Sequence, residues 1–155
     1  MLAVACVSAM AGCAKAPVIP PPPPPVNVVI DVAAAADVNP DATGRASPVT
    51  VRVYALNDET AFSKADFFVL WDREAEALGA SLIARHEFPV APSATAQAAF
   101  KLEAATRAFG VVAAFRDFRT ATWRTTAAVP PTPAPGSTLT LQVAVQSHAV
   151  TAAWK

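Results

Sequence analysis

The alternation of apolar and polar residues after position 26 most strongly constrains what this chain can fold into. Apolar side chains fall at every second position in three segments, 26–32, 49–55 and 139–146. A period of two residues is typical of a β-strand with one buried side and one side facing solvent. These segments therefore predict strands of a sheet that covers a core with one of its faces.

Other segments complete the predicted set of strands. Segment 96–102 alternates less regularly, and segment 109–115 is almost continuously apolar, which predicts a central strand covered on both faces. Further strands are expected at 82–90, 122–128 and 149–154. Short strands separated by Gly, Pro, Asp and Asn turns indicate an all-β fold in which two sheets form a β-sandwich.

One stretch, 59–78, breaks the alternating pattern. We expect one or two short helices there, around a strand at 67–71, with Asp72 capping a helix that ends at Gly79. This predicts a short helical insertion in the sandwich. The proline-rich segment 130–136 predicts a loop before the last hairpin.

The composition excludes several classes of protein. The chain has 155 residues, enough for one domain, with 12 basic and 12 acidic side chains and no net charge. Nucleic-acid binding would need a basic surplus. No apolar run reaches the roughly 18 to 20 residues of a spanning helix, so we expect any membrane attachment to come through a lipid. The two cysteines, Cys6 and Cys13, precede the strands, which excludes a disulfide or cysteine–zinc site in the predicted domain.

The N-terminal residues predict export and lipidation. Residues 1–12 are read as a signal peptide that leads into a lipobox, Met10-Ala11-Gly12-Cys13. The small residues fit a signal peptidase, and the Cys13 thiol is expected to take a diacylglycerol thioether, with a further acyl chain on the freed amine. Stable anchoring needs more than one acyl chain. Because no Lys or Arg precedes the apolar stretch, we expect the natural sequence to begin upstream of Met1. The alternative is a buried N-terminal strand with an incidental cysteine.

Residues 13–25 are expected to form a tether, and residues 26–155 a periplasmic domain. Pro20 to Pro25 predict a polyproline II spacer of roughly 20 Å, with a ligand for a proline-binding module as the alternative. Ala14 follows the lipidated cysteine, where Asp commonly retains lipoproteins in the inner membrane. We therefore expect the protein at the outer membrane, with no cofactor besides the lipid on Cys13.

The sequence carries little sign of catalysis. His86 and His148 are the only histidines, and no zinc-binding or serine-nucleophile motif accompanies them, so we expect no metal site and no enzyme. Arg116, Arg119 and Arg124 lie near Asp117 in sequence. We expect them to form an ion-pair group at a strand end, with an anion site as the alternative. The three tryptophans are expected in the core or at the edge of the sandwich.

The segment between the first two strands, 37–48, is long for a simple connection. Asn39-Pro40-Asp41 predicts a turn, Gly44 can supply positive φ, and Pro48 stops strand pairing before position 49. The loop would thus be stiff while exposing Asp41 and Arg45. A preorganised loop loses less entropy on binding, which makes this segment a candidate binding site; a plain surface connection is the alternative.

An ordered set of short motifs resembles a known family, the outer-membrane lipoprotein of type VI secretion systems (TssJ, also SciN or VasD). The resemblance covers about positions 27–146. The segments that carry it are Asn39-Pro40-Asp41, Gly44-Arg45, 47–56, Ala65-Asp66-Phe67-Phe68, Trp71-Asp72, Leu78-Gly79-Ala80, Glu87-Phe88, 110–117 and Trp123-Arg124.

The resemblance implies a transthyretin-like β-sandwich that is not an enzyme. It implies that the protein anchors the secretion membrane complex to the outer membrane by binding the periplasmic C-terminal region of the inner-membrane protein TssM. The loop between the first two strands is a main contact in that family. The corresponding residues are Asn39, Pro40, Asp41, Thr43, Gly44, Arg45 and Ser47. Substitution of Asn39, Asp41 or Arg45 should then weaken binding without unfolding the domain.

Two other functions are open to a sandwich of this kind. A periplasmic transthyretin-like lipoprotein could bind a small ligand in an apolar cavity with convergent polar groups. A transthyretin-like hydrolase of the purine pathway would carry several histidines and a terminal Tyr-Arg-Gly-Ser type motif. This chain has two histidines, and Tyr54 is its one tyrosine, which argues against the hydrolase.

Overall fold

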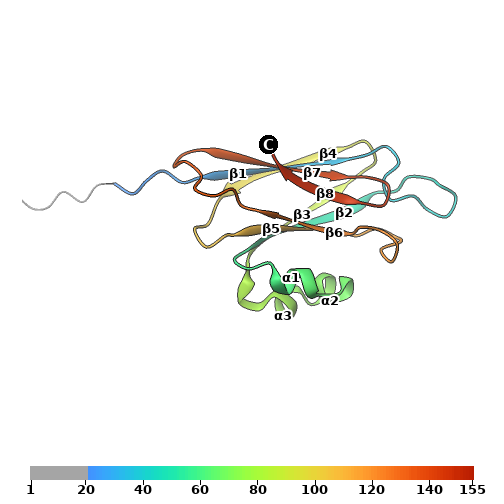
Figure 1. Cartoon of the computed structure of the whole chain (residues 1–155). Coiled ribbons are helices and arrows are strands. Elements are labelled where there is room, and N and C mark those ends of the chain that lie inside the picture. The colour runs from blue at the N-terminus through green and yellow to red at the C-terminus, as the bar shows by residue number, and fades with distance from the viewer. Residues whose placement is uncertain (1–20) are drawn as a thin grey trace, which may run out of the picture.

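The computed structural model describes residues 21–155, which form two β-sheets packed face to face with a helical insertion beneath one of them (Figure 1). The strands are β1 (Asn27–Ala34), β2 (Val49–Leu56), β3 (Leu82–Val90), β4 (Thr95–Lys101), β5 (Ala108–Ala113), β6 (Arg124–Ala128), β7 (Thr138–Val145) and β8 (Val150–Trp154). Sheet A has the order β4-β1-β7-β8, and sheet B has the order β3-β2-β5-β6. Neighbouring strands are antiparallel except β1 and β7, which run parallel.

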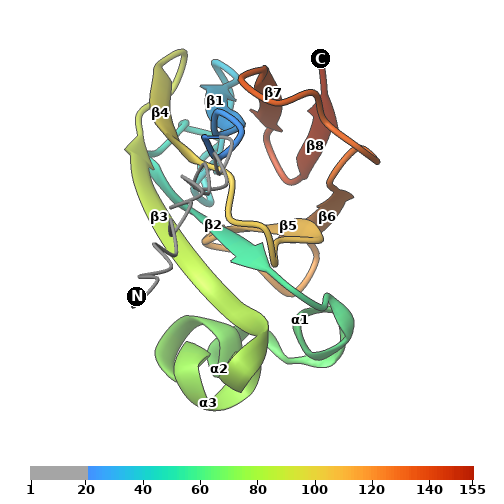
Figure 2. The same ribbon diagram turned by 90° about the vertical axis from the view of Figure 1, so that its left-hand side faces the viewer.

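The sequence prediction of a two-sheet sandwich with a helical insertion is confirmed. Each of the eight strands lies where the sequence placed it, with ends shifted by at most two residues. Val28, Ile30 and Val32 of β1 point into the core, as the alternation required. Strand β5 is buried at every position, because sheet A covers one of its faces and the helices cover the other (Figure 2).

The predicted strand at 67–71 is wrong. The insertion consists of α1 (Thr60–Lys64), α2 (Phe67–Asp72) and α3 (Glu74–Leu78), followed by a 3-10 turn at Gly79–Ser81. A short apolar run does not by itself distinguish a strand from a buried helix. In α2, Phe67 and Leu70, three residues apart, face the sheet, while Phe68 faces solvent, which is helical periodicity.

The predicted cap of the last helix is also wrong. Asp72 is the exposed final residue of α2, and Arg73 stands at the N-cap of α3 without a side-chain capping bond. The predicted end is confirmed, since Gly79 follows α3 with a φ of +49°, which costs glycine little.

A second, smaller core lies between the helices and the outer face of sheet B. Tyr54, Leu56 and Val112 point outward from the sheet into it, where they meet Phe62 and Leu70 of the helices. All five side chains are completely buried. The insertion is therefore fixed to the sheet by apolar packing, worth roughly 1.5–3 kcal/mol for each large side chain.

Glycine at position 110 of β5 makes the close packing of this second core possible. A Cβ added there would lie 2.7 Å from two atoms of the Phe62 ring. The ring thus occupies the space above the bare backbone.

The predicted signal peptide, Cys13 and the start of the tether lie outside the described residues. Among residues 21–155, no helix is both long and apolar enough to cross a bilayer.

Candidate functional site

The loop between β1 and β2 projects from one end of the sandwich, and the described part of the tether joins the other end (Figure 1). Pro21 to Pro25 lead directly into β1, and β1 leads directly into the loop. An eight-residue strand spans about 25 Å. Strand β1 therefore holds the loop at the end of the domain far from the tether.

The tip of the loop is a tight hydrogen-bonded turn. The Gly44 amide donates to the Asp41 carbonyl at 2.9 Å, and the Asp41 amide donates to the Arg45 carbonyl at 2.9 Å. Gly44 has a φ of +82°, so the predicted use of its positive φ is confirmed. The turn begins at Asp41, two residues later than the sequence indicated.

The Asp41 carboxylate holds this turn together. Its Oδ1 accepts hydrogen bonds from the Thr43 amide at 2.9 Å, the Thr43 hydroxyl at 2.6 Å and the Arg45 amide at 3.1 Å. Its Oδ2 lies 3.2 Å from Nε of Arg45. The hydrogen bonds from Thr43, and then those from Arg45, lower the pKa of Asp41 below its ordinary value. Asp41 thus serves mainly to shape the turn, as aspartate commonly does at this position.

Asn39 fixes the loop to the body of the domain. Its side chain is buried; Nδ2 donates to the Pro48 carbonyl at 2.9 Å, and Oδ1 accepts from the Arg116 amide at 2.7 Å. Its φ of +49° lies in the left-handed region, which asparagine tolerates better than most residues. One amide therefore ties together the two ends of the loop and the β5–β6 loop (residues 114–123).

The base of the loop is anchored further by Val38 and by backbone hydrogen bonds. Val38 is fully buried in the core between the sheets. The Ser47 amide donates to the Val38 carbonyl at 3.0 Å, and the Asn39 amide donates to the Ser147 carbonyl at 3.1 Å. The loop is therefore held at its base and at its tip, and only its outer surface faces solvent.

The seven predicted site residues all lie in the β1–β2 loop, but some are exposed at its surface and others are buried beneath it. Thr43, Gly44 and Arg45 are exposed; the Arg45 side chain is 82% exposed, against 18% for Asp41. Pro40 is half-buried. Asn39 and Ser47 are buried, so they support the loop from beneath. A partner would meet the exposed tip, whereas substitution of Asn39 is expected to lower the stability of the folded domain, a cost that the sequence did not indicate.

The predicted ion-pair group around Asp117 is not formed. Within residues 21–155, no ion pair includes Arg116, Arg119, Arg124 or Asp117. Arg124 donates to the carbonyls of Phe62 and Ala65. These partners are distant in sequence, so local spacing did not reveal them.

Arg116 contacts the β1–β2 loop, and the sequence of the loop alone did not reveal this contact. Its amide bonds Asn39, and its Nη2 lies 3.5 Å from Oγ of Ser47. Asn39 and Arg116 are 77 positions apart. The one sequence signal was the presence of Arg116 in a motif of the family resemblance.

The two histidines do not converge on a site. The His86 ring stacks on Phe100 at 4.6 Å, and His148 is exposed. In the part of the chain that the structure describes, no group of three potential metal-ligating side chains is found.

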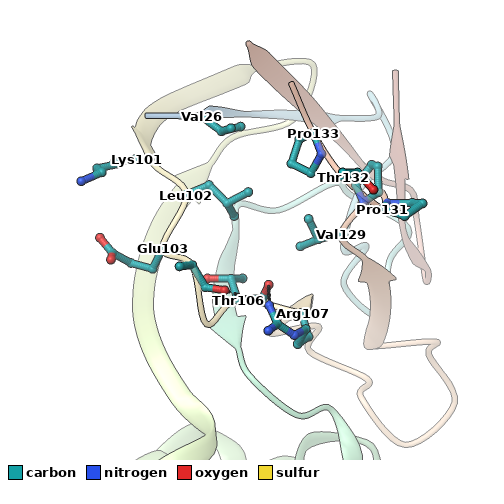
Figure 3. Close-up of a pocket in the computed structure, with 12 residues that line it drawn as sticks. Val26, Lys101, Leu102, Glu103, Thr106, Arg107, Val129, Pro131, Thr132 and Pro133 are labelled. Carbon is teal, nitrogen blue, oxygen red and sulfur yellow. Dashed lines mark hydrogen bonds between the residues drawn. The ribbon is translucent and has the colours of Figure 1, made fainter. Parts of the chain in front are cut away.

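A cavity of about 470 Å³ lies at the tether end of the sandwich, between the β4–β5 and β6–β7 loops (Figure 3). Its walls are formed mainly by Val26, Leu102, Val129 and the prolines of the β6–β7 loop. Lys101 and Glu103 point away from its centre (Figure 3). The third charged residue of the lining, Arg107, donates to the backbone carbonyls of Ala104 and Thr106. The size suits a small ligand, but the charged groups are not arranged to orient one, so the cavity gives the small-ligand alternative little support.

Comparison with known proteins places this geometry among secretion lipoproteins. The family model described as "Type VI secretion lipoprotein, VasD, EvfM, TssJ, VC_A0113" matches residues 26–148. The T6SS lipoprotein TssJ1 from Pseudomonas aeruginosa is 36% identical, with a TM-score of 0.77, over 85% of this chain and 98% of that one. Serratia marcescens Lip, "a membrane bound component of the Type VI Secretion System", is 24% identical, with a TM-score of 0.76, over 84% and 98%.

A third match is a chain in the structure named "T6SS protein TssM C-terminal domain" from EAEC. It is 25% identical, with a TM-score of 0.65, over 82% of this chain and 97% of that one. No curated protein sequence matches the chain.

Proposed function

Because this chain belongs to the type VI secretion lipoprotein family of VasD, EvfM and TssJ, we propose that it anchors the secretion membrane complex to the outer membrane by binding the periplasmic region of a TssM-like inner-membrane protein. The family is a structural, non-enzymatic component of that complex. Beyond this family role, three features are proposed for the present chain: its partner, the surface that contacts the partner, and the membrane that holds the lipid.

The observation that carries the proposal is the position of the loop relative to the tether. The described tether enters one end of the domain, and the loop leaves the opposite end (Figure 1). A lipid on Cys13 would hold the first end at a membrane, so the loop would face away from it. A protein reaching up from the inner membrane would meet the loop first.

The loop also has the physical properties of a binding element. Its tip is fixed by the Asp41 hydrogen bonds and its base by Asn39 and Val38. The exposed groups are the Thr43 hydroxyl, the bare backbone at Gly44 and the Arg45 guanidinium. A loop that is already ordered loses little entropy when it docks. Arginine is among the residues that most often dominate binding energy at interfaces.

The partner is suggested by the comparisons and tested by titration. One matching chain belongs to a structure named for the C-terminal domain of TssM, and that name supports a TssM-like partner here. Arg45→Glu should weaken binding to the periplasmic domain of the TssM-like protein by at least about tenfold, as measured by isothermal titration calorimetry. The ion pair between Arg45 and Asp41 lies at the surface and contributes little to stability, so the domain should stay folded.

Lys101→Glu is the matched control, because it reverses an exposed charge at the tether end of the domain. Its affinity should equal that of the wild type. Equal affinity of the Arg45→Glu and wild-type proteins would contradict the loop contact.

The membrane attachment is tested separately. Radiolabelled palmitate should enter the wild-type protein and not a Cys13→Ser variant, and the labelled protein should fractionate with outer membranes. Equal labelling of both proteins, or label found with inner membranes, would count against the anchor.

A further inference from the structure

Five aromatic side chains form a cluster where α2 meets the β5–β6 loop. Phe67 is at its centre: its ring lies 4.8 Å from Phe118, 5.7 Å from Trp71 and 5.2 Å from Trp123. Phe118 and Trp71 stack on it, and Trp123 meets it edge to face. Phe68 is the fifth member. We call this set the aromatic cluster; in it, packed rings lead from the domain interior to its surface.

Phe68 lies at the solvent-exposed edge of the aromatic cluster. It is 56% exposed, and it is the one large apolar side chain that is exposed in residues 21–155. Its ring packs edge to face on Phe118 at 5.0 Å and on Phe67 at 5.4 Å. The second core is complete without this ring, because Phe67 and Leu70 already cover the sheet. Stability of the fold therefore does not account for Phe68.

The aromatic cluster is held rigidly from behind. The Arg52 guanidinium lies 3.8 Å above the Trp71 ring and donates to the Trp71 carbonyl at 2.6 Å, while its Nε bonds Glu87 at 2.7 Å. Arg124 lies 4.8 Å from the Trp123 ring and donates to the Ala65 carbonyl at 2.5 Å. The exposed ring therefore stands on a fixed base, as an interface anchor does.

The aromatic cluster and the β1–β2 loop share one support, the β5–β6 loop. Arg116 of that support bonds Asn39 and approaches Ser47. Phe118 follows Arg116 by two residues, so their Cα atoms are at most about 7 Å apart. The Phe118 ring packs against Phe68. One loop thus contacts both the base of the β1–β2 loop and the aromatic cluster.

The loop that supplies Phe118 and Trp123 to the aromatic cluster also carries exposed arginines. Residues 116–124 contain three arginines and one aspartate. Arg116 and Arg119 are exposed, and within residues 21–155 neither forms an ion pair. The Asp117 carboxylate is engaged by the Thr120 hydroxyl at 2.7 Å. An exposed apolar ring that packs on a loop with exposed arginines fits a partner surface that offers an apolar pocket and nearby carboxylates.

We propose that Phe68, together with Arg116 and Arg119 of the β5–β6 loop, is a second contact for the protein that binds the β1–β2 loop, and that Phe68 enters an apolar pocket with acidic side chains near it on that partner. This inference rests on the proposed function, because it assigns the same TssM-like periplasmic domain to both contacts. The helical insertion then serves to hold one aromatic anchor beside the loop.

Titration of the full-length mature protein against the TssM-like periplasmic domain tests the inference. Phe68→Ser should weaken binding by about 10- to 30-fold, the loss typical of a central aromatic anchor. Phe68→Leu should recover part of it, because it restores apolar volume. Arg119→Glu should weaken binding and make the remaining affinity less sensitive to salt. Lys101→Glu, at the tether end, is the control for charge reversal.

A labelled cysteine at position 68 gives an independent measurement that does not need the serine variant to fold. Cys6 and Cys13 are the only cysteines of the chain, so a Phe68→Cys/Cys13→Ser protein without its signal peptide takes a single environment-sensitive fluorophore. The emission should shift to shorter wavelength when the partner is added.

The outcomes separate the two proposals. If Arg45→Glu weakens binding while Phe68→Ser and Arg119→Glu stay within about twofold of wild type, the second contact is wrong and the loop contact stands. An unchanged fluorophore signal with bound partner has the same meaning. If the wild-type protein self-associates and Phe68→Ser abolishes this self-association without changing partner affinity, the inference is also overturned. If the wild-type protein does not bind the partner at all, both proposals fail.

Discussion

Substitution of Asn39 tests whether one buried side chain holds the candidate binding loop in place. Asn39→Ala removes the donor to the Pro48 carbonyl and the acceptor of the Arg116 amide. A buried polar group without a partner costs about 1–3 kcal/mol, and because both bonds are only partly buried we take the lower half of that range for each. Alanine at a φ of +49° adds roughly 1 kcal/mol. The total expected loss is about 3–5 kcal/mol.

Two further substitutions at Asn39 separate the terms. Asn39→Gly loses the same hydrogen bonds but adopts the left-handed φ without strain, so it should cost roughly 1 kcal/mol less than alanine. Asn39→Asp keeps the acceptor for the Arg116 amide but places a carboxylate oxygen against the Pro48 carbonyl. Its cost should shrink as the pH falls and the carboxyl becomes protonated, because a protonated carboxyl can donate to that carbonyl.

Urea unfolding followed by tryptophan fluorescence measures these differences. A loss of about 3 kcal/mol should lower the urea midpoint by more than about 1 M. The Asn39→Ala protein should still be folded in the absence of urea, since domains are stable by about 5–15 kcal/mol. Asn27→Ala is the matched control, because Asn27 is exposed and its removal should change stability by less than about 0.5 kcal/mol. A loss below about 1 kcal/mol in Asn39→Ala, or an equal loss in the glycine and alanine variants, would refute the reasoning.

Two further predictions concern the second core. Gly110→Ala should destabilise the domain by about 1–3 kcal/mol, because the new Cβ would lie 2.7 Å from the Phe62 ring; in urea unfolding, the Gly110→Ala/Phe62→Leu double variant should lose less than the sum of the two single changes. Burial raises the pKa of Tyr54 to about 12, against about 10 in the unfolded chain. The unfolded state then binds fewer protons above pH 10, so stability should fall between about pH 10 and 12, by on the order of 2–3 kcal/mol. Because Tyr54 is the one tyrosine, tyrosinate absorbance reports it alone, and a folded-state midpoint near 10 would contradict the burial argument.

Much of the sandwich could be predicted from the sequence, because the information that determines a strand is local. Alternation placed β1, β2 and β7, and the continuous apolar run placed β5 at the centre. The error at α2 arose where periodicity was uninformative: the run 67–71 is apolar throughout. Which of its side chains would face solvent depended on sheet B, which is formed by distant residues.

Only the local features of the candidate site could be predicted, because its other contacts involve residues that are distant in sequence. The turn chemistry of Asp41 and Gly44 is local, and both residues lie at the predicted tip with the hydrogen bonds or positive φ that their types favour. The buried position of Asn39 depends on the Arg116 amide, 77 positions away. Arg124 bonds backbone carbonyls of the insertion, and no local spacing could distinguish that arrangement from an ion pair.

If the domain connects a lipid anchor to a partner as proposed, the topology explains how a small sandwich can carry the load. The tether enters at the start of β1, and the loop leaves at its end (Figure 1), so tension between membrane and partner would run along this strand. Strand β1 lies inside sheet A, paired with β4 on one side and β7 on the other through registers of seven and eight residues. Inter-strand hydrogen bonds run across the strand direction, so pulling on β1 would load many of them together in shear. An edge strand at this position would have half as many neighbours to share the load, and the loop would depend on a single row of bonds.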